Sequence, residues 1–146
     1  MKALAALTRL SRLSLDEKRL KLLALQADRD KLAAARDRLL REIDAEREAA
    51  AASIEGSWGF SGFLEDARLR LRVLGRDFAE LYLRCFAARE EVLASFSEVK
   101  TYETIRKNHR ARERAEEKLR ERGETDELAL EVFRRGASTG LSQAKN

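Results

Sequence analysis

Apolar residues recur every three or four positions along most of the chain, which is the spacing of an amphipathic helix. The most regular run begins at Phe60 and advances alternately by four and three residues as far as Tyr102. Because a lone helix would leave so regular a stripe in water, the run predicts a partner helix packed along it. Its members, of which only Ser95 is polar, are Phe60, Leu64, Ala67, Leu71, Leu74, Phe78, Leu81, Cys85, Ala88, Val92, Ser95, Val99 and Tyr102.

The N-terminal half carries a less regular helical pattern. Residues with high helix propensity run almost without interruption from about residue 8 to residue 55. One apolar track consists of Leu22, Leu25, Leu32, Ala35, Leu39 and Ile43. An upstream set follows the same rhythm on a neighbouring track, and it consists of Leu10, Leu13, Leu20, Ala24 and Ala27. This half is therefore predicted to be one amphipathic helix with a drifting apolar seam.

The two periodic segments are separated by the sequence EGSWGFSGFLEDA, residues 55–67. Its three glycines, Gly56, Gly59 and Gly62, predict that the chain leaves helical geometry and turns back. Ser61 is the expected N-cap of the second helix. The segment also holds the only tryptophan, Trp58, and two phenylalanines. Two interpretations of these aromatic residues stay open: they cover the tip of the bend, or they offer an exposed contact to a partner.

The sequence thus predicts an all-α protein, an antiparallel two-helix coiled-coil hairpin with a protruding C-terminal helical end. The expected segments are a helix over about 8–55, a hinge over 56–62, a helix over about 63–122, a short helix or continuation over about 125–135, and a disordered tail over 136–146. A fold centred near residue 59 pairs positions whose numbers sum to about 118, which places Tyr102 beside Asp16 and Ala111 beside Leu7. At ~1.5 Å per residue the rod would be ~75–95 Å long.

Composition supports long helices over a compact body. Charged residues make up 38% of the chain and aromatic residues 6%, and there is no proline to interrupt a helix. The net charge is +4, and residues 100–122 alone hold nine Lys and Arg against five Asp and Glu, again a difference of +4. An electrostatic partner is therefore expected near the end of the chain.

On a helix the charges of this segment form two neighbouring rows. Arg110, Arg114, Lys118 and Arg122 form a basic row, and Glu113, Glu117 and Glu121 form an acidic row that could pair with it at a spacing of three. The segment is either a solvated helix held by its own ion pairs or a basic face that docks on an acidic protein surface. Nucleic acid is disfavoured because the cations alternate with acids and no aromatic residue is present for stacking.

Beyond Gly123, Thr125 could cap a further helix. Its apolar face, formed by Leu128, Val132 and Phe133, has no evident partner within the hairpin.

The residue inventory argues against an enzyme. Cys85 is the only cysteine and His109 the only histidine, so neither an intrachain disulfide nor a closed zinc site can form. Cys85 falls on the predicted buried track and should be inert. There is no phosphate-binding loop and no apolar run long enough to cross a membrane, and the N-terminal stretch is interpreted as the start of a helix rather than a transit peptide. No catalytic residue, cofactor or metal is expected.

Three short motifs resemble the FliJ family of flagellar export proteins. They are Trp58–Phe63 at the bend, Lys100–Glu103 where the stripe ends, and Asp126–Ala129 late in the chain. The similarity extends over about residues 5–135. With its injectisome relatives, this family provides the central stalks of type III secretion ATPases, and the sequence does not separate the flagellar from the injectisome system.

The resemblance implies a non-enzymatic, cytoplasmic stalk and assembly factor that is peripheral to the inner-membrane export apparatus. The end with both termini would enter a hexameric export ATPase, the other half would contact the cytoplasmic part of the membrane export gate, and export chaperones would be further partners. The candidate ATPase contacts are Arg106, Lys107, Arg110, Arg114 and Lys118. The candidate gate contacts are Trp58, Phe60, Phe63, Ala67 and Leu74.

The chain is expected to be a monomer that binds no nucleic acid and does not insert into a membrane. The alternatives are a generic structural coiled-coil adaptor or a homodimer, which could associate through Leu128, Val132 and Phe133, and, less favoured, a polyanion binder.

Overall fold

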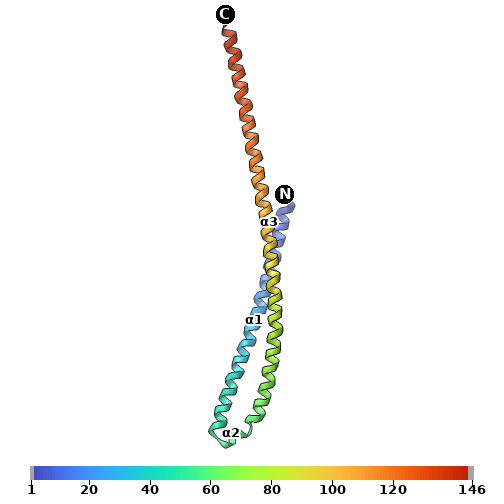
Figure 1. Ribbon diagram of the computed structural model, residues 1–146, viewed down its shortest axis with the longest axis vertical. Helices are drawn as coiled ribbons and strands as arrows, with labels where there is room; N and C mark the ends of the chain where they lie inside the picture. The colour runs from blue at the N-terminus through green and yellow to red at the C-terminus, as the bar shows by residue number, and fades with distance from the viewer. Residues whose placement is uncertain (1, 145–146) are drawn as a thin grey trace.

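The computed structural model describes the backbone of residues 2–144 and the side chains of residues 2–140. It contains a long helix α1 (Lys2–Ala52), a short helix α2 (Ile54–Trp58) and a very long helix α3 (Phe60–Ala144), as Figure 1 shows. Residues 2–144 contain no β-strand.

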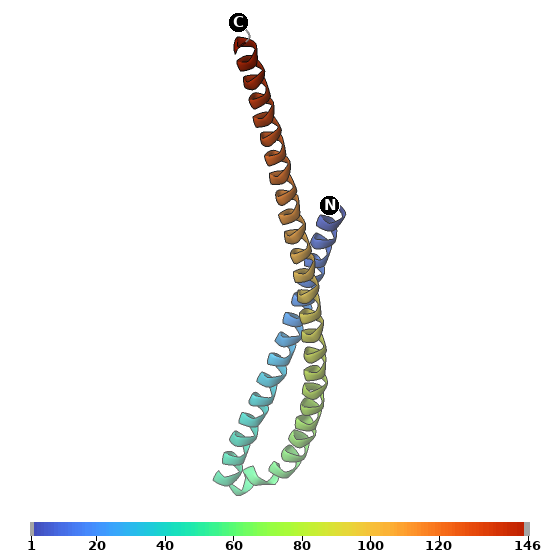
Figure 2. The same ribbon diagram turned by 45° about the horizontal axis from the view of Figure 1, so that its top comes forward.

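Helices α1 and α3 run antiparallel and pack against each other, and α2 closes the bend between them (Figure 1). In both views the N-terminus lies beside the middle of α3, and α3 continues alone beyond it (Figures 1 and 2). The all-α hairpin with a protruding C-terminal end is therefore confirmed.

The seam on α3 follows the predicted stripe. Each of its thirteen positions from Phe60 to Tyr102 is buried or half-buried, and Cys85 is buried as expected. The heptad phase is kept over this whole length, as coiled-coil packing requires.

The seam on α1 agrees with the prediction only in the half nearer the bend. Leu22, Leu25, Leu32, Ala35, Leu39 and Ile43 all face α3, and each is buried or half-buried. The upstream set was assigned wrongly, since the structure exposes all of its members: Leu10, Leu13, Leu20, Ala24 and Ala27. The upstream seam is formed instead by Leu4, Thr8, Ser11, Leu15 and Lys18.

Small hydroxyl residues can take these seam positions because their polar atoms are satisfied within the helix. The Thr8 hydroxyl donates to the carbonyl of Leu4 over 2.8 Å, and the Ser11 hydroxyl donates to the carbonyl of Thr8 over 2.9 Å. Across the seam, the Lys18 ammonium donates to the Ser95 hydroxyl over 2.6 Å. The half of the hairpin that carries the N-terminus therefore combines these polar contacts with the buried side chains of Leu15 and Val99.

The apolar core lies near the bend. Leu39 and Ile43 of α1 and Ala67 of α3 are buried together, and they are surrounded by Phe63, Leu64, Leu71 and Leu74. Burial of aliphatic and aromatic side chains is the main favourable term in such packing. Away from the bend the same term comes from the buried residues Leu15, Cys85, Ala88 and Val99.

Ser53 makes the bend. It has the only extended conformation between α1 and α2 (φ −149°, ψ 152°), and its hydroxyl accepts a hydrogen bond from the amide of Gly56 over 2.9 Å, which caps α2. Helix α3 already begins at Phe60, so Ser61 is not its N-cap. No glycine of residues 2–144 has a positive φ, and the expectation that the glycines supply a non-helical turn is wrong.

The pairing register differs from the predicted one by three to six residues, which is about one to one and a half helical turns. Arg12 contacts Glu103, Lys18 contacts Ser95, and Lys21 contacts Glu91, so the paired numbers sum to 112–115 instead of about 118. The reason is that α2 holds the reversal, which centres the turn several residues before Gly59.

Helix α3 passes without interruption through Gly123 and through residues 136–144, where a disordered tail was expected. Thr125 does not cap a new helix, because its hydroxyl donates to the carbonyl of Glu121 within α3. An ion pair of 2.7 Å between Arg135 and Glu131 supports the same stretch. Residues 145 and 146 of the expected tail lie outside the described part. At ~1.5 Å per residue α3 is ~125 Å long, so the rod exceeds the predicted length.

Gly56 is required for close approach rather than for an unusual dihedral angle. A Cβ atom at this position would lie 2.8 Å from the Ala49 carbonyl oxygen and 2.8 Å from the Ser53 hydroxyl oxygen, whereas a Cβ atom at Gly62 would meet nothing within 4 Å. Gly56→Ala should therefore lower the free energy of unfolding by about 1–3 kcal/mol. Gly62→Ala should leave it unchanged or raise it by up to ~1 kcal/mol, because alanine is favoured inside a helix. Urea unfolding of both variants tests this, and equal stabilities would contradict the assigned bend geometry.

Candidate functional sites at the two ends of the rod

The C-terminal end of α3 extends beyond its partner helix. Near the start of α1, Leu4 and Ala5 lie beside Arg106, His109 and Glu113, so α3 has no helical partner beyond about residue 113. Every side chain from Arg110 to Gly140 is exposed. We call residues 110–144 the overhang.

The coiled-coil seam ends in polar residues. The alternating steps of the apolar stripe continue from Tyr102 to Arg106 and His109, and both of these side chains are half-buried. The Nδ1 atom of His109 lies 3.3 Å from a carboxylate oxygen of Glu113. His109 thus lies at the last contact between α1 and α3.

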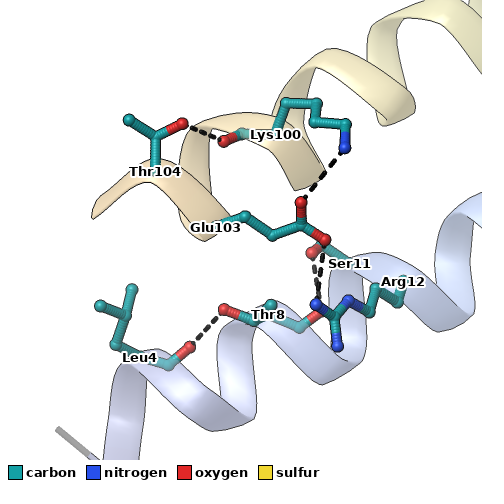
Figure 3. Close-up of polar contacts among 7 residues, drawn as sticks. All are labelled: Leu4, Thr8, Ser11, Arg12, Lys100, Glu103 and Thr104. Carbon is teal, nitrogen blue, oxygen red and sulfur yellow. Dashed lines mark hydrogen bonds and ion pairs between the residues drawn. The ribbon is translucent and has the colours of Figure 1, made fainter. Parts of the chain in front are cut away.

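An ion-paired cluster joins the helices just before the overhang (Figure 3). The Arg12 guanidinium of α1 donates to the Glu103 carboxylate of α3 over 2.9 Å, and Lys100 lies 3.4 Å from the other oxygen of the same carboxylate. The hydrogen bond that Glu103 accepts from Arg12 lowers the pKa of Glu103, and Lys100 lowers this pKa further. This cluster is a polar contact between α1 and α3 about two helical turns before the overhang.

Four of the five predicted ATPase contacts lie around one groove. Arg106, Lys107, Arg110 and Arg114 line a surface groove of about 310 Å³ together with Arg12, Glu103 and Ala111. Lys118 lies one turn further along, in a second shallow depression that it shares with Arg122. The structure thus places the predicted basic residues on one continuous side of α3.

The ion pairs predicted within the overhang are not formed. Among the ion pairs of residues 2–140, none joins Arg110 to Glu113, Arg114 to Glu117 or Lys118 to Glu121. Instead Glu113 pairs with His109, and Arg120 approaches Glu116 at 4.0 Å. Arg110, Arg114 and Lys118 thus make no direct ion pair, although the acidic row lies beside them on the same helix.

At the other end, the predicted gate contacts differ in accessibility. Trp58 is 78% exposed, so it does not plug the bend. Phe60, Phe63 and Leu74 are half-buried, and Phe63 packs against the core. Ala67 is only 1% exposed and has no surface to offer to a partner. Its place on the apolar stripe explains this burial.

A groove near the bend was missed by the sequence analysis. It has a volume of about 520 Å³ and lies between α1 and α3, and Leu69 and Val73 are its exposed apolar residues. Its other lining residues are Ala35, Arg38, Leu39, Glu42, Arg70 and Leu74. The sequence signal that could have indicated this groove is the spacing of four residues between Leu69 and Val73, which lie off the main apolar stripe.

The apolar residues predicted at the C-terminal end, Leu128, Val132 and Phe133, are all exposed, as the absence of a partner helix requires. Leu130 is exposed on another side of the same stretch and was not singled out.

The model of the family described as the flagellar FliJ protein matches residues 1–138 of the 146-residue chain. The chain belongs to the FliJ family. The searches of curated proteins and of solved structures gave no match. Membership of this family links the chain to flagellar protein export as a structural component rather than as an enzyme.

The described residues of this FliJ-family chain hold no group of three or more His, Cys, Asp or Glu side chains placed to bind a metal ion. Within the same residues, no helix has a stretch apolar enough and long enough to cross a bilayer.

Glu103→Gln should weaken the contact between α1 and α3 at the Arg12–Glu103–Lys100 cluster, and the effect should depend on pH. The folded state lowers the pKa of Glu103, so the ionised carboxylate stabilises the hairpin above the unfolded-state pKa, and this stabilisation is lost as the pH falls through the folded-state pKa. The variant should therefore melt at a lower temperature than the parent chain at neutral pH. The two melting temperatures should converge once the pH lies below the lowered folded-state pKa of Glu103. A difference that persists at acid pH would show that the carboxylate charge is not the cause.

Proposed function

We propose that this chain is the central stalk of the flagellar export ATPase, acting as an assembly factor that joins the hexameric ATPase to the membrane export gate. One observation carries the proposal: α3 continues past α1 as a lone helix for about 30 residues, or ~45 Å. A rod with one narrow, exposed end and one broad, capped end is suited to enter a ring at the narrow end and to contact a second body at the other.

Charge supports the assignment of the overhang to the ATPase. Arg110, Arg114 and Lys118 are exposed and lie on one side of α3, and the described ion pairs leave them without an acidic partner. Arg106 and Lys107 extend this side into the groove beside α1. An acidic lining of the ring opening would complement this surface, and desolvation inside the opening would strengthen each contact.

The triple reversal Arg110→Glu, Arg114→Glu and Lys118→Glu should weaken binding to the export ATPase at least ~10-fold, since each reversed charge exchanges an attraction for a repulsion and tenfold corresponds to ~1.4 kcal/mol. Stimulation of the ATPase should fall in parallel, while circular dichroism should show unchanged helicity. Salt should weaken the parent interaction more than that of the variant.

A matched control reverses three exposed arginines within the hairpin, Arg68, Arg72 and Arg76, which changes the net charge by the same amount. This control should bind and stimulate the ATPase as the parent chain does. Equal losses in both variants would show that net charge, and not the overhang, is responsible.

The bend end is assigned to the cytoplasmic part of the export gate. Trp58 presents a large, rigid aromatic surface at the tip, and such side chains dominate the energetics of many interfaces. Phe60 and Phe63 are partly accessible beside it, and Leu74 lines the neighbouring groove. Ala67 supports this surface from below through the packing of Leu39 and Ile43.

Trp58→Ala should leave the melting temperature nearly unchanged, because the side chain is exposed, and should weaken binding to the gate domain by ~2 kcal/mol or more if it is an anchor. Calorimetric titration of the gate domain measures this. Phe133→Ala removes an equally exposed aromatic side chain from the overhang and should leave gate binding intact. Equal binding by the parent chain and the Trp58→Ala variant would refute the assignment.

Export chaperones and a position at the cytoplasmic face of the inner membrane complete the proposed role. Both rest on family membership, and no residue of the chain is assigned to them. The exposed face of Leu128, Val132 and Phe133 is proposed as a further apolar contact within the ring.

A further inference from the structure

The back of α1 carries a second heptad stripe that points away from α3. Leu10, Leu13 and Leu20 are 62%, 54% and 67% exposed, although leucine is usually a buried residue. Successive steps of three and four residues join them to further exposed positions on the same face. The full set, all exposed, is Ala3, Ala6, Leu10, Leu13, Glu17, Leu20, Ala24, Ala27, Lys31 and Ala34.

This stripe has the properties of a coiled-coil seam. It spans more than four heptads, and eight of its ten members are leucine or alanine. It stays on one side of α1 because the packing against α3 already holds that helix to a repeat of seven. In the monomeric hairpin nothing within the described residues covers it.

We propose that the free chain pairs with a second copy of itself through the backs of the two α1 helices, arranged antiparallel with paired residue numbers that sum to about 37. The pairing replaces the monomer expected from the sequence, in which the same leucines were assigned to the contact with α3. It concerns the unbound chain and does not depend on the proposed stalk role.

Side-chain size favours this register. Leu10 faces Ala27 of the second copy, and Leu13 faces Ala24 of the second copy, so each large residue meets a small one. Two-fold symmetry repeats both layers on the other side of the axis. Matching large with small residues lets two helices interdigitate without voids.

Charge at the edges favours the same register. In an antiparallel coiled coil, residues at the same heptad position beside the seam face each other across the two helices. This brings Arg9 opposite Asp30 of the second copy and Lys2 opposite Asp37 of the second copy. No ion pair among residues 2–140 uses Lys2 or Arg9, and Asp30 and Asp37 contact only the adjacent arginines of their own helix. No like charges meet across these edges.

Glu17 is the charged member near the centre of the stripe, and it serves to fix the register. Glu17 faces Leu20 of the second copy. Its carboxylate can also reach Lys21 of the second copy, the next residue after that leucine. A charged side chain at one seam position of a coiled coil costs stability but selects a single alignment. If the helices were shifted so that the sum of the paired residue numbers fell by seven, Asp16 would face Asp16 of the second copy, and the two carboxylates would repel each other.

Sedimentation equilibrium of the purified full chain tests the pairing. The parent chain should approach twice its monomer mass of 16.6 kDa as concentration rises. The double variant Leu13→Glu and Leu20→Glu should raise the dissociation constant at least ~100-fold, because it places charge in four symmetry-related layers, and should keep its helicity because both residues are exposed. A parent chain that stays monomeric up to its solubility limit would overturn the proposal.

A matched control uses the back of α3, where Leu83 and Leu93 are similarly exposed. Leu83→Glu with Leu93→Glu should dimerise as the parent chain does, and loss of the dimer in this control alone would assign the interface to α3 and overturn the proposal. The register is tested by charge: Arg9→Glu should weaken the dimer ~10-fold, and Arg9→Glu combined with Asp30→Arg should restore it. Failure of this rescue would exclude the stated register.

Discussion

The structure depends on the burial of one apolar stripe of α3 against α1. A helix as long as α3 is stabilised in water mainly by tertiary packing rather than by intrinsic propensity, and only the part from Phe60 to His109 receives such packing. The packing is uneven along the seam. Large apolar side chains gather around Leu39, Ile43 and Ala67 near the bend, whereas hydroxyl and charged groups such as Ser11 and Lys18 hold the other end.

This gradient gives the two ends of the rod different physical characters. The bend is fixed by the capped turn at Ser53 and by the close approach at Gly56, so the surface around Trp58 is presented on a stable support. At the opposite end the cluster of Arg12, Glu103 and Lys100 joins the two helices, and α3 is bare from about residue 110 onward. A rod with one capped end and one bare end suits the proposed stalk role.

Sequence periodicity predicted the α3 seam because its phase never changes over six heptads. It failed for the first part of α1 because that helix has two stripes, and the more apolar one is not the one that packs. Periodicity shows that Leu10 and Leu13 share a face, but only the phase imposed by the core at Leu39 and Ile43 decides which face meets α3. The turn was predicted too late in the chain because the glycines were read as sites of unusual dihedral angles. Gly56 is needed instead because a Cβ atom would not fit there. The basic side of the overhang was predicted, whereas the absence of internal ion pairs there depends on side-chain geometry.

The solitary length of α3 has a thermodynamic consequence for any protein that grips it. Without tertiary contacts, its amide hydrogens are protected only by local helix–coil equilibrium, so their exchange should become faster along the helix beyond the last turn of α1. A partner that encloses this segment must compensate for the entropy lost on ordering it, and part of the favourable contact energy is spent in that way. The overhang is therefore suited to reversible binding, in which the partner can release it repeatedly.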